Sequence, residues 1–152
     1  MKHKIIAQGA EAIIYHGSPR KLEGELLLPK QADDLNKNPD NLSNAIYATD
    51  IKNAAIAMAI IKCEGISSSS LDINKKTQGI IYNGWPKQEH IYLCYLPQKI
   101  FTQSVKMKHQ FISKEPVKPI KIEKLNIKDY LHLVRKATPE EIIIWKNKHD
   151  KF

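Results

Sequence analysis

The stretch Ala12-Ile13-Ile14-Tyr15-His16-Gly17-Ser18-Pro19 decides the fold. It opens with a short apolar run of β-branched and aromatic residues, which predicts a buried strand, and the Gly-Ser-Pro that follows predicts the turn that ends the strand. The strand delivers His16 to its end, where Gly17 lets backbone approach a ligand closely. A structural histidine after a strand has the same local pattern, so a second motif is needed to choose between the two interpretations.

The second motif is Ile46-Tyr47-Ala48-Thr49-Asp50. Residues 45–48 predict another strand, and Thr49 or Asp50 can cap a following helix because a side-chain oxygen accepts an orphan backbone N–H. Apolar residues recur at helical spacing from Ile51 to Ile61 and also fill the other side, which predicts a helix buried nearly all round. Between the two motifs, residues 30–43 are polar and have no period, which predicts a long surface loop.

The remaining sequence predicts several strands and then small helices. We expect strands at 79–82, 91–96, 106–113 and 117–122, and a short helix from Asn126 to Leu133. The segment Thr138-Pro139-Glu140-Glu141 is a capping box with proline at the first helical position, which predicts a terminal helix. Nothing repeats, and the patch Ser67–Ser70 is too short for a linker, so we expect one domain spanning 1–152. This order of elements predicts an α+β fold rather than alternating βαβ units.

The two motifs together resemble the ADP-ribosyltransferase superfamily, in its poly(ADP-ribose) polymerase and diphtheria-toxin-like branch. The family has a His-Gly-Ser at the end of its first strand, a polar loop, and an Ile-Tyr motif that leads into an Ala-rich helix. The small bacterial rifamycin ADP-ribosyltransferases are closest in layout, because Asn53-Ala54-Ala55-Ile56 and Ser113-Lys114-Glu115-Pro116-Val117 match two further segments. The resemblance covers residues 12–122 and implies split, mostly antiparallel β-sheets with few helices that form an NAD cleft.

The resemblance also implies an activity: an NAD-dependent mono-ADP-ribosyltransferase that transfers ADP-ribose to an unidentified acceptor and releases nicotinamide. In the family the histidine bonds the adenosine ribose, and the glycine backbone and a nearby serine hold the carboxamide. The tyrosine stacks on the nicotinamide ring. The matching positions here are listed from the first motif to the second: His16, Gly17, Ser18, Tyr47 and, in the same site, Thr49.

The catalytic carboxylate is the weakest part of the match. Glu115 lies just before a predicted strand, where the toxin and polymerase branches place a catalytic glutamate, which joins His16 and Tyr47 as the third catalytic candidate. The rifamycin enzymes use an aspartate after an earlier strand, a slot that falls near Gln103, and glutamine cannot act as a base. A catalytically inactive NAD- or ADP-ribose-binding domain therefore stays open. A Glu115 that points into the cleft favours the enzyme, and one that faces solvent favours the binding domain.

A second departure lies on the predicted helix. The polymerases carry a serine and a second tyrosine after the motif tyrosine, at positions that are Ala55 and Met58 here. One face of the nicotinamide site is therefore weaker in this chain or comes from other residues.

The charge of the chain gives a third class of function. The chain has 152 residues, with 24 Lys plus Arg against 16 Asp plus Glu, so 24 − 16 gives +8. Only Arg20 and Arg135 are arginine, and the other cations are lysine. Arginine is the residue whose planar guanidinium binds phosphates and guanine edges through two hydrogen bonds, so the indication of nucleic-acid binding is weak. Residues 101–152 hold 12 cations and 6 anions, so the basicity lies in the C-terminal third. A basic nucleic-acid-binding module is the less favoured alternative.

Several other classes are excluded by composition. Cys63 and Cys94 are the only cysteines, too few for a disulfide framework or a zinc knuckle, and no histidine spacing indicates a metal. There is no Gly-x-Gly-x-x-Gly loop, which excludes a Rossmann NAD site. No apolar stretch approaches the ~20 residues of a membrane span, and the basic N-terminus lacks a signal-peptide core. We expect a soluble, cytoplasmic protein whose partners are NAD and an acceptor: a small molecule, a protein or a nucleic acid.

Overall fold

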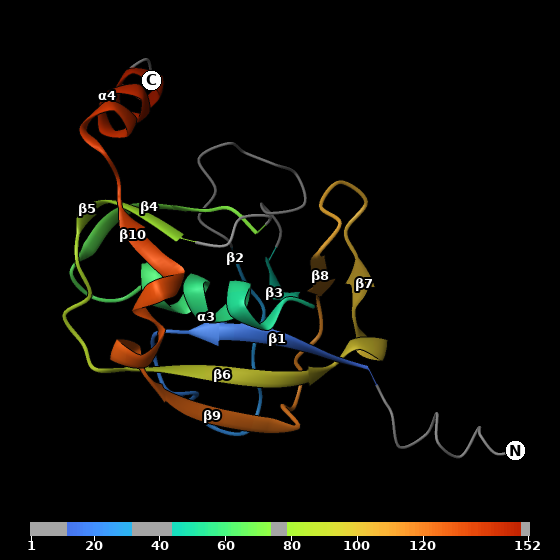
Figure 1. Ribbon diagram of the computed structural model, residues 1–152. Helices are drawn as coiled ribbons and strands as arrows, with labels where there is room; N and C mark the ends of the chain where they lie inside the picture. The colour runs from blue at the N-terminus through green and yellow to red at the C-terminus, as the bar shows by residue number, and fades with distance from the viewer. Residues whose placement is uncertain (1–11, 32–43, 74–78, 150–152) are drawn as a thin grey trace, which may run out of the picture.

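The computed structural model describes residues 12–31, 44–73 and 79–149, and contains two β-sheets with one helix between them (Figure 1). The larger sheet has the order β7-β8-β3-β1-β6-β9, with β2 on β3, and the smaller sheet has the order β10-β5-β4. The strands are β1 (Ile13–Ser18), β2 (Lys30–Gln31), β3 (Asn44–Thr49), β4 (Ile66–Leu71), β5 (Gly79–Gly84), β6 (His90–Pro97), β7 (Thr102–Gln103), β8 (Gln110–Ser113), β9 (Lys121–Asn126) and β10 (Val134–Lys136). The helices are α3 (Lys52–Ile61) and α4 (Pro139–His149), with 3-10 helices η1 (Gln98–Ile100) and η2 (Ile127–Leu133).

The strand pairing confirms the α+β class with mostly antiparallel sheets. Every pairing in the larger sheet is antiparallel, and β1 lies in its centre between β3 and β6. In the smaller sheet β4 pairs antiparallel with β5, whereas β10 pairs with β5 in parallel. The central position of β1 places the first sequence motif in the interior of the larger sheet.

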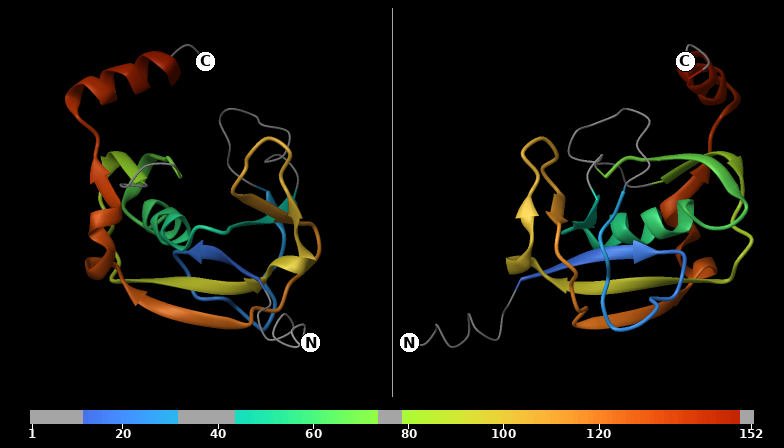
Figure 2. Two further views of the ribbon diagram at one scale, coloured as in Figure 1. Left: turned by 45° about the vertical axis from the view of Figure 1, so that its right-hand side comes forward. Right: turned by 180° about the vertical axis from the view of Figure 1, so that it is seen from behind.

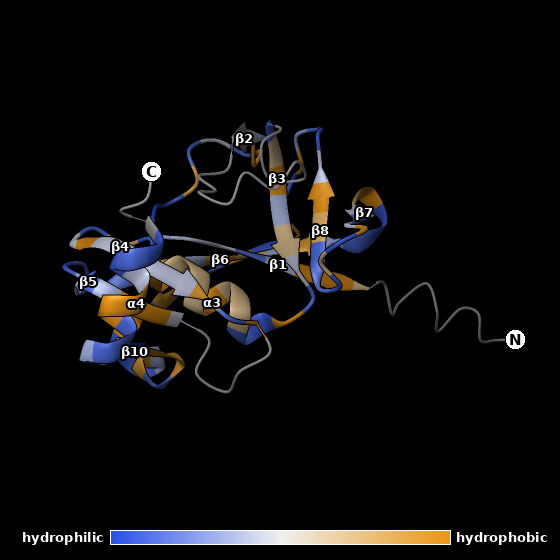
Figure 3. Ribbon diagram, turned by 90° about the horizontal axis from the view of Figure 1, so that it is seen from above, coloured by the Kyte–Doolittle hydropathy of each residue, from blue (hydrophilic) through white to orange (hydrophobic). Residues whose placement is uncertain are grey.

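Helix α3 is buried nearly all round, as its sequence predicts, because it contacts strands of both sheets. Figure 3 shows most of the helix in apolar tones. Its side chains are mostly alanine and isoleucine, and small residues let it approach β1 closely. A Cβ at Gly17 would lie 1.9 Å from the carbonyl oxygen of Ala55 and 3.0 Å from the Cβ of Ala59. Gly17 is therefore required for the packing of α3 on β1.

Two apolar clusters lie on the two faces of the larger sheet. One cluster joins α3 to β6, β5 and η2, and its fully buried members include Ile60, Ile91 and Leu93. The other cluster lies on the opposite face, around Ile14 and Leu96. The segment 19–29 crosses this second face (Figure 2), where Leu27 forms an isolated bridge with Val117. Leu27 is thus an apolar anchor rather than part of a named strand.

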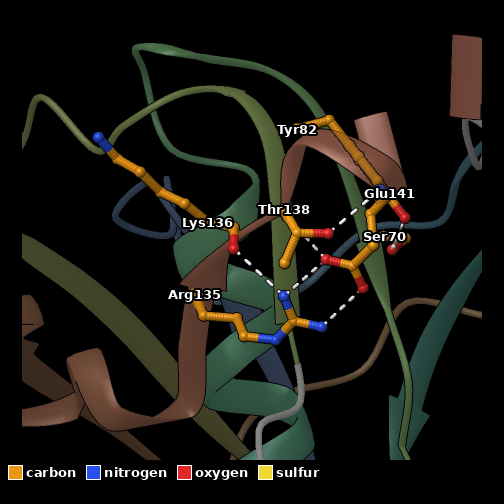
Figure 4. Close-up of polar contacts among 6 residues, drawn as sticks. All are labelled: Ser70, Tyr82, Arg135, Lys136, Thr138 and Glu141. Carbon is orange, nitrogen blue, oxygen red and sulfur yellow. Dashed lines mark hydrogen bonds and ion pairs between the residues drawn. The ribbon is translucent and has the colours of Figure 1, made fainter. Parts of the chain in front are cut away.

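Helix α4 projects from the rest of the structure and is fixed at its first turn (Figures 2 and 4). The predicted capping box is present: Glu141 N–H donates to Thr138 Oγ1 at 3.1 Å, and Thr138 N–H donates to Glu141 Oε1 at 2.8 Å. Arg135 on β10 donates to both carboxylate oxygens of Glu141, each at 2.8 Å. Trp145 stacks on Tyr82 of β5 with ring centroids 5.4 Å apart.

The predicted cap of α3 was wrong. The N-cap residue is Ile51, and it makes no side-chain cap hydrogen bond. Thr49 Oγ1 accepts from Ile51 N–H at 3.1 Å, one step before the helix begins. Asp50 Oδ1 instead lies 2.9 Å from Nδ1 of His109, the residue just before β8. The Asp50 carboxylate is therefore not available to cap the helix.

Several other elements differ from the sequence expectations. The strand expected at 106–113 is only Gln110–Ser113, because the residues before it form the turn that joins β7 to β8. The strand expected at 117–122 lies at Lys121–Asn126, and the helix expected after it is the 3-10 helix η2. Strands β4 and β10 were not predicted. Most of the loop expected at 30–43 lies outside the described residues, except that Lys30–Gln31 is the strand β2.

In the part of the chain that the structure describes, we find no helix with the length and apolarity needed to cross a membrane.

Candidate functional site

His16 and Tyr47 meet where β1 and β3 part. The register of these two strands has one aligned pair, Tyr15 opposite Thr49, while β1 stays paired with β6 as far as Ser18. Beyond the aligned pair, His16 Nδ1 lies 2.7 Å from the carbonyl oxygen of Tyr47. A carbonyl can only accept, so Nδ1 carries the proton, and in the neutral ring Nε2 is then an acceptor. The contact joins the two sequence motifs at a split in the sheet.

Gly17 and Ser18 have local structural duties in this arrangement. Gly17 makes room for α3, as described above. Ser18 Oγ donates to the carbonyl oxygen of Arg20 at 2.9 Å and accepts from Arg20 N–H at 3.1 Å. This is the side-chain turn typical of serine, and it directs the chain out of β1. Thr49 is buried and uses its hydroxyl in the link between β3 and α3. The structure therefore brings His16, Gly17 and Tyr47 together and gives Ser18 and Thr49 shaping roles beside them.

Glu115 lies away from this junction. It is exposed and follows β8, where its N–H donates to Ser113 Oγ at 3.2 Å and its carbonyl oxygen accepts from the same hydroxyl at 2.9 Å. Tyr47 is opposite Ile112, whereas Glu115 lies beyond the end of β8 at Ser113. Gln103 is also exposed, on β7, and its Nε2 donates to the carbonyl oxygen of Lys108 at 2.5 Å.

A row of polar side chains that the sequence did not reveal crosses the larger sheet beside the junction. Directly opposite residues of antiparallel strands point to the same face of a sheet. The pairings Gln110–Thr49, Thr49–Tyr15, Tyr15–Tyr95 and Tyr95–Lys121 run without interruption from β8 to β9. We call these five residues the polar row. No local pattern signals it, because its members come from five strands and depend on their register.

The β9 end of the polar row carries a set of ionisable groups. The Tyr95 hydroxyl donates to Glu123 Oε1 at 2.7 Å, and its ring lies edge-on to Tyr15 with centroids 5.3 Å apart. Lys52 Nζ, from the first residue of α3, lies 5.4 Å from the centre of the Tyr95 ring, and Lys121 Nζ lies 5.0 Å from it. Burial raises the pKa of Tyr95, and the hydrogen bond to Tyr95 raises the pKa of Lys52. This group ties the start of α3 to β6 and β9.

A cavity of about 340 Å³ lies just past the first motif, lined by Pro19, Arg20, Lys62, Glu64 and Gln88. Gln88 Nε2 donates to the carbonyl oxygens of Pro19 and His90 at 2.6 and 2.8 Å, and Gln88 Oε1 accepts from Glu64 N–H at 3.1 Å. These bonds fix the exits of β1 and α3 to the start of β6. The volume is within the range of small-molecule sites, and its two cations suit an anionic group.

The described side chains contain no group of three or more His, Cys, Asp and Glu residues that could hold a metal ion. Cys63 and Cys94 are free and buried, and Cys63 Sγ donates to the carbonyl oxygen of Ala59 at 3.4 Å.

No family model, curated protein or solved structure matches this chain.

Proposed function

We propose that this chain binds NAD where β1 and β3 part, with His16 and Tyr47 as the central contacts. One observation carries the proposal: the 2.7 Å contact between His16 Nδ1 and the Tyr47 carbonyl oxygen. It fixes the imidazole with Nε2 as acceptor, which suits a ribose hydroxyl, and it places the Tyr47 strand beside it, where a tyrosine ring can stack on nicotinamide.

The cavity beyond Ser18 supports the same proposal. Its cations, Arg20 and Lys62, lie at the exit of β1 and α3, so a dinucleotide held at His16 could direct its pyrophosphate toward them. Glu64 also lines the cavity and balances part of this charge. The proposed ligand is therefore a dinucleotide of modest net charge rather than a polyanion.

Binding without transfer is the version that the geometry supports best. Mono-ADP-ribosyl transfer, the activity that the resemblance implies, needs a carboxylate near the ribose, where positive charge develops as nicotinamide leaves. Glu115, the predicted carboxylate, is exposed and lies past the end of β8. Transfer to an acceptor stays the second candidate, favoured by the same two motifs.

The test is titration calorimetry of the full chain with NAD and with ADP-ribose. We expect His16→Ala to lower the affinity for both ligands at least tenfold, and Tyr47→Ala to lower the affinity for NAD more than that for ADP-ribose. Tyr47→Phe keeps the ring and should retain most of the affinity. His132→Ala, an exposed histidine on η2, is the matched control and should bind normally. A folded wild-type chain that binds neither ligand refutes the proposal.

A further inference from the structure

We infer that Gln110, at the β8 end of the polar row, makes this a site that holds NAD without cleaving it. The inference rests on the proposed function and deepens it, because it names intact NAD as the ligand and one side chain as the reason.

Cleavage breaks the bond between ribose C1′ and the nicotinamide nitrogen. Nicotinamide leaves as a neutral molecule with the bonding electron pair, and positive charge develops on the ribose. The oxygen or nitrogen of water or an acceptor then forms the new bond to C1′ and gives up a proton. A carboxylate on the same face stabilises the charge and takes that proton, which contributes about 10²–10⁴-fold to the rate.

The register identifies which β8 side chains share a face with Tyr47. Ile112 is directly opposite Tyr47, and Gln110 is directly opposite Thr49, so both are on that face. Phe111 and Ser113 belong to the other face, and both are buried there. Of the two β8 residues that share the face of Tyr47, one is apolar and the other is a half-buried amide.

The carboxylates nearest to the polar row are already engaged. Asp50 Oδ1 is 2.9 Å from His109 Nδ1 at the exposed end of β3 and β8. Glu123 accepts from the Tyr95 hydroxyl at 2.7 Å, and it is on β9, which is separated from β3 by β1 and β6. Among the described residues, the β8 position opposite Thr49 is therefore filled by the amide of Gln110, next to the apolar Ile112 opposite Tyr47 on the same face.

A glutamine in this position changes the chemistry but not the recognition. Its amide donates and accepts hydrogen bonds, so it can hold a ribose hydroxyl as a carboxylate would. It carries no charge to oppose a developing cation, and it cannot take a proton from an acceptor. A ligand bound here is retained intact, and the position needs only an ionised oxygen in place of the amide nitrogen to become competent.

The experiment compares the wild-type chain with Gln110→Glu and Gln110→Asp. NAD affinity is measured by calorimetry, and nicotinamide release is measured by chromatography of the same mixtures. We expect the wild type to bind NAD and release nicotinamide at the uncatalysed rate, and Gln110→Glu to release it roughly 10²-fold faster or more. Folding of each variant is monitored by circular dichroism. If Gln110→Glu does not fold, nicotinamide release is measured with Gln110→Asp, which carries the same charge on a shorter side chain. Gln103→Glu makes the same charge change on β7. It tests the position at which the rifamycin enzymes, by resemblance, would place their aspartate.

Each outcome has a separate meaning. Nicotinamide release by the wild type at the rate of Gln110→Glu overturns the inference and leaves NAD binding standing. NAD binding with no release from either folded Gln110 variant also overturns it, and so does release that requires Gln103→Glu. No NAD binding by the wild type refutes the proposed function itself, and the inference with it.

Discussion

Cys63 and Cys94 show how burial removes the reactivity of a thiol. Both are buried, and burial raises the pKa of each to about 11. The thiolate is the reactive form, so at pH 8 only about 10⁻³ of each group is ionised. We expect no reaction of the folded chain with an aromatic disulfide reagent at this pH, and reaction of both thiols after unfolding in guanidinium. Rapid labelling of the folded chain would contradict this and show that one cluster opens.

Gly17 offers a second prediction for a single residue. In Gly17→Ala the new Cβ would meet the backbone of α3, which cannot rotate away, so the helix or the strand must shift. Overpacking of this kind costs about 1–3 kcal/mol of the free energy of unfolding. Urea denaturation followed by circular dichroism measures the loss. Gly79→Ala is the comparison, because its Cβ would meet the side chains of Ile61 and Val134, which can adjust, and its loss should be smaller.

Among the elements, α4 depends on one carboxylate. The hydrogen bonds from Arg135 and then from the Thr138 backbone lower the pKa of Glu141 from 4.5 to about 2. A lowered pKa in the folded state means that the stabilisation of α4 is complete above about pH 4.5 and is lost as the pH falls toward 2.

Trp145 reports the attachment of α4, since its ring stacks on Tyr82. In a Trp85→Phe background, its fluorescence should stay constant from pH 7 to about 4.5 and change as the pH falls toward 2. Glu141→Ala, which removes both the capping oxygen and the partner of Arg135, should show the detached signal at neutral pH. A signal that changes fully above pH 5 would mean that another group controls this helix.

The elements that could be predicted from the sequence are those specified by local interactions. The helix at 52–61 and the capping box at Thr138 are specified within a few residues, and both were predicted. Strand β4 consists largely of serines, which have no hydrophobic period, so it is defined by its pairing with β5. The turn at 106–109 has an alternating sequence that imitates a strand, but Gln110 N–H is bonded to the Met107 carbonyl oxygen within the turn.

The same distinction holds for the site. His16 and Tyr47 stand in short motifs that can be read directly, and the structure places His16 Nδ1 2.7 Å from the Tyr47 carbonyl oxygen. The polar row depends on the register of five strands, and no segment of sequence contains that register. Gln110 was therefore not recognised, whereas Glu115, which has a favourable local pattern, lies past the end of its strand.

For the molecule as a whole, the excess of lysine is divided between distant edges of the larger sheet. Lys106 and Lys108 are in the turn beside β7, and Lys121 and Lys124 are on β9 at the opposite edge. A nucleic acid needs a continuous basic strip, because each neutralised phosphate adds to the affinity and to its salt dependence. The arrangement favours weak, long-range attraction of a small anion instead.

We therefore expect only weak binding of a fluorescent oligonucleotide at 50 mM salt, measured by anisotropy, and none at 200 mM salt. NAD affinity should change only slightly over the same range, because one dinucleotide releases few counterions. Tight oligonucleotide binding that survives 200 mM salt would instead support the nucleic-acid-binding alternative.

The parallel pairing of β10 with β5 also sets the order in which the two sheets can fold during biosynthesis. Residues 134–136 lie beside residues 79–81, so the whole segment 85–133 is made between the two strands. Until then β5 has β4 on one side and an unpaired edge on the other, and unpaired edges invite association with other chains. The strands of the larger sheet all lie before residue 127, so this sheet can assemble on the ribosome first, whereas the packing of α3 is completed only by η2 and β10. A chain released before β10 is made would keep its larger sheet and expose the unpaired edge of β5. Premature termination is therefore a route to aggregation.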